Sequence, residues 1–77
     1  MGQPSFRTHQ AMELVINGET LTLTNVENIS DLLSQLDLNS DRVAVEVNLQ
    51  IVRRDDRATF RLQDQDKIEI VSFIGGG

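Results

Sequence analysis

The hydrophobic and polar positions of the chain begin with a period of two. Met12, Leu14 and Ile16 fall on one face of an extended run, Asn17-Gly18 follows, and residues 20–24 alternate leucine with threonine. Alternation of this kind is typical of a half-buried strand. Asn-Gly between two such runs favours a hairpin, because both residues tolerate positive φ. The pattern therefore predicts a two-stranded hairpin.

The period then changes to that of a helix. Positions i, i+3, i+4 and i+7 are apolar at Ile29, Leu32, Leu33 and Leu36, which is the stripe of an amphipathic helix. Asn28 or Ser30 can cap its start, and the carboxylate of Asp31 suits the positive end of the helix dipole. We expect one helix of about three turns.

The second half of the chain predicts three more strands. They are the alternating valines of residues 43–47, a short strand at Ile51 and Val52, and a last strand at residues 67–74. A right-handed crossover through the helix can pair the third strand with the first in parallel, and the last strand can also lie parallel to the first. The order β-β-α-β-β-β predicts an α+β domain, a mixed sheet packed on one helix.

The N-terminal residues differ from the rest. Residues 1–11 show no apolar period and hold the only proline and the only histidine. Polar segments of this kind are usually unfolded. We expect residues 1–11 to be a flexible extension or an added leader, and residues 12–77 to form the domain.

The amino-acid composition excludes several kinds of functional site. The chain has 77 residues, no cysteine and one histidine, which excludes disulfides, thiolate catalysis and a multi-histidine metal site. A formal net charge of −5 argues against nucleic acid as a partner. No stretch is apolar enough for a membrane span. We expect a cytoplasmic location.

The chain ends in Gly75-Gly76-Gly77. Consecutive glycines cost entropy to order and do not help the fold. They give a thin segment with a carboxylate at its tip, which can thread a narrow tunnel and present that carboxylate for activation. The alternative is a disordered tail or an added segment without a function.

Charged and apolar clusters offer two further candidates. Arg53, Arg54, Arg57 and Arg61 either form a patch for an acidic partner or pair with Asp55 and Asp56 in solvent, and we favour the pairing. The pairs Asp55-Asp56 and Asp64/Asp66 indicate surface turns rather than a metal site. Val71 and Phe73 share the face of the last strand opposite Ile68 and Ile70, and they predict a patch where a partner docks.

Three segments carry a resemblance to a known family. They are the strand at residues 43–48, the run Ile51-Val52-x-Arg54, and the ending from Asp64 to Gly77. Together they resemble the ThiS family, the sulfur carriers of thiamine biosynthesis, which implies a β-grasp (ubiquitin-like) fold. The family often has glycine where this chain has Gln65, and an aromatic residue near Arg57.

The resemblance implies a carrier cycle rather than an enzyme. A ThiF-like, E1-like adenylyltransferase would use ATP and Mg to activate Gly77, a cysteine desulfurase would supply sulfur, and the thiocarboxylate would donate it to a ThiG-like thiazole synthase. Gly75 and Gly76 would thread the partner's site, and no cofactor would be bound. The residues expected to dock partners are Arg54, Val71, Phe73 and Ile74. The alternatives are a carrier for molybdopterin or tRNA thiolation, a ubiquitin-like modifier, or a non-covalent interaction module.

Overall fold

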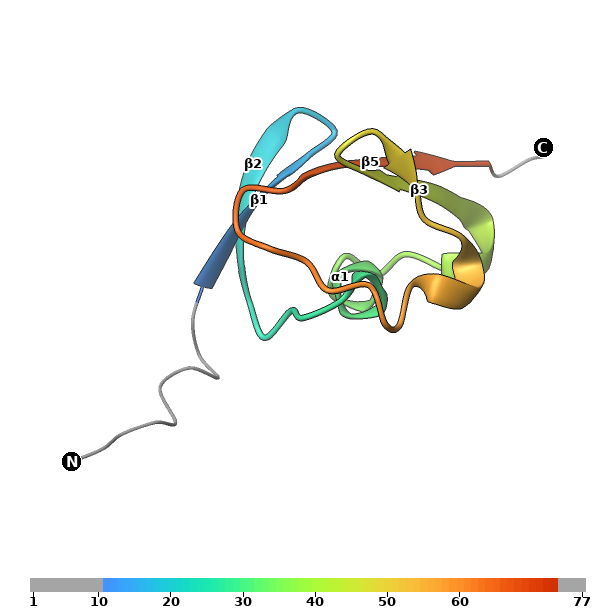
Figure 1. The fold of residues 1–77 in the computed structure, drawn as a ribbon, viewed down its shortest axis with the longest axis horizontal. Helices are drawn as coiled ribbons and strands as arrows, with labels where there is room; N and C mark the ends of the chain where they lie inside the picture. The colour runs from blue at the N-terminus through green and yellow to red at the C-terminus, as the bar shows by residue number, and fades with distance from the viewer. Residues whose placement is uncertain (1–10, 74–77) are drawn as a thin grey trace.

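The computed structural model of the chain describes residues 11–73. Five strands form one sheet in the order β2-β1-β5-β3-β4 (Figure 1). Their bounds are β1 Ala11–Ile16, β2 Glu19–Thr24, β3 Val43–Val47, β4 Gln50–Ile51 and β5 Lys67–Ser72. β1 and β5 are parallel and the other pairs are antiparallel. The predicted mixed sheet of an α+β domain is confirmed.

The predicted neighbour of the first strand is wrong in part. β5 lies between β1 and β3, and β3 runs antiparallel to β5. The third strand therefore does not pair with the first, whereas the last strand does so in parallel. Ile68 and Ile70 bury the inner face of β5 in the core. The central place also pairs its backbone groups on both sides.

The helix α1 spans Ile29–Gln35, seven residues or about two turns rather than three. Asn28 is the N-cap, and its side chain accepts a 2.8 Å hydrogen bond from the Asp31 N–H. The Asp31 carboxylate in turn accepts from the Asn28 N–H, which completes a capping box. Leu36, the last residue of the predicted stripe, is the C-cap. Within residues 11–73, no helix has the length and apolarity to cross a membrane.

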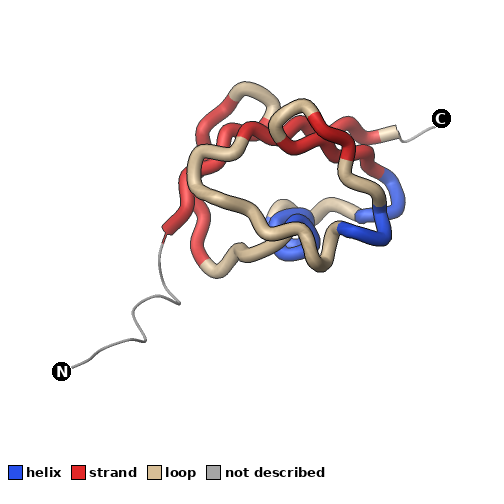
Figure 2. The backbone as a smooth tube through the Cα atoms, in the orientation of Figure 1, coloured by secondary structure: helices blue, strands red, loops and turns tan. Residues whose placement is uncertain are grey.

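The core lies between the sheet and the helix. Leu14, Ile29 and Leu32 are fully buried, and the buried set takes one face of each of the strands β1, β3 and β5. Figure 2 shows the helix on one side of the strands and the long segment after β4 passing close to it. Val52 and Leu62 anchor that segment in the core. Within the described residues 11–73, the other face of the sheet carries no α-helix.

Two turn asparagines hold β5 from its two sides. Asn17, at φ 51°, donates its side-chain N–H to the Ile70 carbonyl at 3.1 Å and accepts from the Ile70 N–H at 2.8 Å. Asn48, at φ 52°, accepts from the Lys67 N–H at 3.0 Å. The amide groups therefore continue the ladder where the neighbouring strands end. They fix the register of the strand that leads to the C-terminal residues.

Candidate functional site

The end of β5 is the part of the described structure nearest the candidate carboxylate. Val71 is 59% exposed and Phe73, the last described residue, is 54% exposed, whereas Ile68 is buried. The predicted alternation of faces is therefore confirmed. Ile74 and the glycines Gly75–Gly77 lie outside the described residues, so their roles stay predictions.

Among residues 11–73, the large apolar side chains that are exposed are Leu49 in the turn between β3 and β4, and Ile51, Val71 and Phe73 on one side of the sheet. Ile51 on β4 is 74% exposed and pairs with Glu46 on β3. Ala44, two residues before Glu46 and on the same face of β3, pairs with Val71 on β5. We call Ala44, Ile51, Val71 and Phe73 the open-face patch. A shallow cleft of about 140 Å³ lies between Ile51 and Val71, and one of about 260 Å³ lies between Ile51 and Phe73.

The sequence located half of this patch. Val71 and Phe73 were found from their place in the last strand, but Ile51 was missed. Ile51 and Val52 are adjacent apolar residues, and only one of two neighbours in a strand can face the core. Val52 is buried, so Ile51 points to solvent. Two adjacent apolar residues in the predicted short strand, Ile51 and Val52, were therefore the signal in the sequence that one of them would be exposed.

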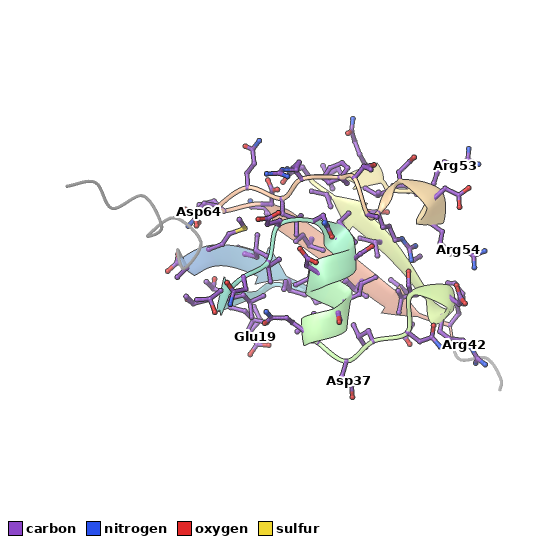
Figure 3. The ribbon with its side chains drawn as sticks, turned by 90° about the horizontal axis from the view of Figure 1, so that it is seen from below. Glu19, Asp37, Arg42, Arg53, Arg54 and Asp64 are labelled. Carbon is purple, nitrogen blue, oxygen red and sulfur yellow. The ribbon has the colours of Figure 1, made fainter. Side chains whose placement is uncertain are left out.

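Arg54 reaches the same cleft as Phe73. Its guanidinium donates to the Asp41 carboxylate at 2.8 Å, and both side chains are mostly exposed. This hydrogen bond and the charge of Asp41 raise the pKa of Arg54 above its ordinary value. Figure 3 shows Arg53 and Arg54 directed away from the body of the domain. Arg54 and Phe73 thus line the same cleft, and the docking role of Arg54 stays a prediction.

The arginine cluster does not act as one group. Among residues 11–73, ion pairs join Arg54 to Asp41 and Arg61 to Glu27, so the favoured pairing with the neighbouring aspartates is wrong. Neighbours in a short turn point apart and do not face each other. The turn of residues 54–56 instead directs Arg54 across to the 3-10 turn of residues 40–42.

Arg57 is the member that turns inward. It is only 5% exposed, and its guanidinium donates to the Ser40 carbonyl at 2.7 Å, the Ser40 hydroxyl at 3.0 Å and the Val43 carbonyl at 3.0 Å. Burial lowers the pKa of Arg57 below its ordinary value, and the charge of Arg54 adds to the effect. Arg57 is therefore a clamp between two backbone segments and not part of a surface patch.

The acidic pairs lie in surface turns, as predicted. Asp55 and Asp56 are exposed in the 3-10 turn of residues 54–56, and the Asp66 carboxylate accepts from the Gln63 N–H at 2.8 Å within its own turn. The Asp64 carboxylate instead accepts from the Glu13 N–H of β1 at 2.7 Å. No group of three or more His, Cys, Asp or Glu side chains within residues 11–73 is placed to hold a metal ion. Gln65, where the family often has glycine, adopts φ 74°.

Within residues 11–73, a mixed sheet with the parallel pair β1–β5 at its centre and one α-helix over one face defines a β-grasp domain. The model of the ThiS family matches residues 9–77. A crystal structure of the thiamine biosynthesis protein ThiS from Geobacter metallireducens superimposes with a TM-score of 0.73 at 33% identity, covering 86% of this chain and all of that one. The chain belongs to the ThiS family.

Relatives of two sizes match the chain. The sulfur carrier protein ThiS of Escherichia coli is 32% identical over 66 residues, which cover 86% of this chain and 100% of that protein. A thiazole synthase of Paramagnetospirillum magneticum is 47% identical over 66 residues. The chain spans about a fifth of the length of that synthase, because the match covers 20% of it. The region of that synthase that is similar to this chain is therefore one part of a longer polypeptide.

Proposed function

We propose that the chain is a sulfur carrier of thiamine thiazole biosynthesis that works through the carboxylate of Gly77. The observation that carries this proposal is the family match over residues 9–77, which includes the three terminal glycines. The match to the Escherichia coli sulfur carrier over that protein's whole length supports it. The chain then acts as a substrate of other enzymes in the cytoplasm and binds no cofactor of its own.

The chemistry follows from the reactivity of a carboxylate. A carboxylate is a poor electrophile, so an E1-like adenylyltransferase first converts it to an acyl-adenylate with MgATP. A desulfurase takes sulfur from cysteine as an enzyme persulfide, whose outer sulfur displaces AMP and forms an acyl disulfide. A thiol reductant then cleaves the S–S bond and leaves the thiocarboxylate on the terminus. Because the chain contains no cysteine, the terminus is the place on it where sulfur can be carried. ATP and Mg belong to the partner enzyme.

Thiazole synthase is the proposed acceptor of the sulfur. The relatives from Paramagnetospirillum magneticum and Magnetococcus marinus are named thiazole synthases and contain a segment similar to this chain. A carrier domain and its acceptor in one polypeptide support a direct encounter between the two. Rescue of a thiazole auxotroph, set against rescue of a molybdopterin-deficient strain, tests this assignment. Rescue of the second strain alone would contradict it.

The open-face patch is the proposed dock for the adenylyltransferase. Its apolar side chains adjoin the strand that precedes the terminus, and Phe73 is followed by four residues. A segment of that length reaches at most about 14 Å, at about 3.5 Å per residue. The docked surface must therefore lie close to the entrance of the enzyme's active site. Val71 and Phe73 satisfy this condition better than any residue of β2, at the opposite side of the sheet.

Charge substitutions on one face of the sheet test the dock. Val71→Asp and Ile51→Asp should each lower kcat/KM for adenylation about tenfold or more, because each removes an apolar anchor and adds a carboxylate to a cleft that Glu46 and Glu69 already line. Thr20→Asp, on the same face but at the far edge, should stay within about twofold. Melting temperatures of all three should remain near that of the unchanged chain. An equal loss of kcat/KM in the three variants would contradict the proposal that the adenylyltransferase docks on the open-face patch.

A further inference from the structure

The strand β2 forms a free edge of the sheet. It pairs with β1 over all six of its residues, and no other described strand pairs with its outer side. Natural proteins blunt such edges with lysine, proline or bulges. β2 reads Glu-Thr-Leu-Thr-Leu-Thr and has no lysine or proline, and its one charged residue is Glu19 at its start. Within residues 11–73, no strand pairs with the outer side of Thr20 and Thr22.

The outward backbone groups of β2 can be identified from the hairpin. Ile16 and Glu19 close the two-residue turn, so the pairs 16–19, 14–21 and 12–23 exchange hydrogen bonds. In agreement, Val15 and Asn17 direct their N–H groups to the other side, toward β5. The N–H and C=O groups of Thr20 and Thr22 thus point away from the sheet. The Thr24 carbonyl also points outward, where it accepts from the Gln35 side chain at 2.7 Å.

A groove adjoins the open part of this edge. It encloses about 360 Å³ between the β1–β2 hairpin and the segment that follows α1, and its walls include Leu21, Leu36, Leu38 and Ile70. Leu21 lies at the edge itself and is half-buried. A strand paired with β2 would direct every second side chain toward this groove, as in strand addition to a sheet edge.

The charged groups placed at this margin are acidic. Glu19 belongs to β2 and lines the groove. Residues 11–41 contain no Lys or Arg. Glu19 and Asp37 lie along the same margin of the molecule (Figure 3) and make no ion pair with a described residue. A second copy of the chain would bring the same acidic side chains to this edge. A basic segment of another protein is the complementary occupant.

We propose that β2 and its groove bind an extended segment of a partner protein, with alternating apolar residues and a lysine or arginine at its end. The segment would add a sixth strand beside β2. The strand β2 lies at the edge of the sheet opposite β4. The proposal does not depend on the chemistry of the terminus.

A designed peptide tests the site on the full chain. The probe is a capped seven-residue peptide of alternating valine and threonine with a lysine at each end, titrated while amide shifts are followed by NMR. Shifts should centre on Thr20 and Thr22. The same peptide N-methylated on the amides of its pairing side should not bind, and a version with glutamate ends should bind about two- to fivefold more weakly.

Two substitutions of Thr22 form a matched pair. Thr22→Pro removes an outward N–H without touching the β1 ladder, so it should weaken binding about fivefold or more. Thr22→Val keeps the N–H and should bind within about twofold of the unchanged chain. Equal binding by both variants, or shifts centred on the open-face patch, would overturn the proposal. So would dimerisation of the free chain that Thr22→Pro abolishes, since the edge would then pair with its own copy.

Discussion

Replacing Arg57 with methionine should cost more stability than any exposed arginine can. The guanidinium makes three hydrogen bonds with Ser40 and Val43, and the bond to Val43 is buried. These two residues flank the start of β3, where Val43 pairs with Ser72 and the Arg42 carbonyl accepts from the Phe73 N–H at 2.9 Å. The hydrogen bonds of Arg57 thus hold the start of β3, which in turn pairs with the end of β5.

The size of the loss follows from the groups left behind. A hydrogen bond to a charged group contributes about 1.5–3 kcal/mol, and each carbonyl left unpaired costs about 1–3 kcal/mol. Relief of the buried charge offsets part of this, because a buried cation carries a desolvation penalty. We expect Arg57→Met to lower the free energy of unfolding by about 3 kcal/mol, which in a domain of this size is about 12–24 °C in Tm.

Urea and thermal unfolding of the full chain measure the effect. Arg53→Met is the matched control, because Arg53 is exposed, and it should change stability by less than about 0.5 kcal/mol. Arg57→Lys should recover only part of the loss, since an ammonium lacks the planar fork that spans two carbonyls. A loss below about 1 kcal/mol for Arg57→Met would refute the clamp.

Two further substitutions test how the turns are built. Gln65→Gly should raise the free energy of unfolding by about 0.5–1 kcal/mol in urea titrations, because Gln65 has φ 74° and its side-chain hydrogen bonds are exposed. A lower free energy of unfolding would show that those side-chain bonds contribute more than the positive φ costs. Asn17→Gly should lower it by about 1–2 kcal/mol even though glycine suits φ 51°, since two partners of Ile70 are lost. Asn25→Gly is the control, because Asn25 has φ 61° and its side chain makes no hydrogen bond to a described residue; it should be neutral or stabilising. Similar losses of stability in the Asn17 and Asn25 variants would argue against a role for the Asn17 side chain in holding β5.

Local chemistry was sufficient to predict the elements. Asn17-Gly18 adopts positive φ at both residues and closes the hairpin, and Asn28 caps the helix with Asp31. Both features depend on neighbours in sequence. The helix is shorter than its apolar stripe because Leu36 still packs against the core as the C-cap. A stripe reports burial, and burial continues beyond the last helical hydrogen bond.

Long-range features were not available from the pattern. The place of β5 between β1 and β3 depends on which strand gains most from two neighbours, and no local period encodes that choice. Arg57 sits among charged residues and looks solvated, yet acceptors 14 and 17 positions away draw it inward. Val71 and Phe73 were predictable because alternation along a strand assigns a face. Their role in docking stays a prediction.

The most direct test is the intact mass of the chain after reaction, with the mass of its C-terminal fragment to locate the change. The full chain is incubated with an E1-like adenylyltransferase, MgATP, a cysteine desulfurase, cysteine and a thiol reductant. We predict one oxygen of the Gly77 carboxylate replaced by sulfur, and no change in a chain lacking Gly76 and Gly77. An unchanged mass with active enzymes, or adducts joined to lysines through Gly77, would contradict it.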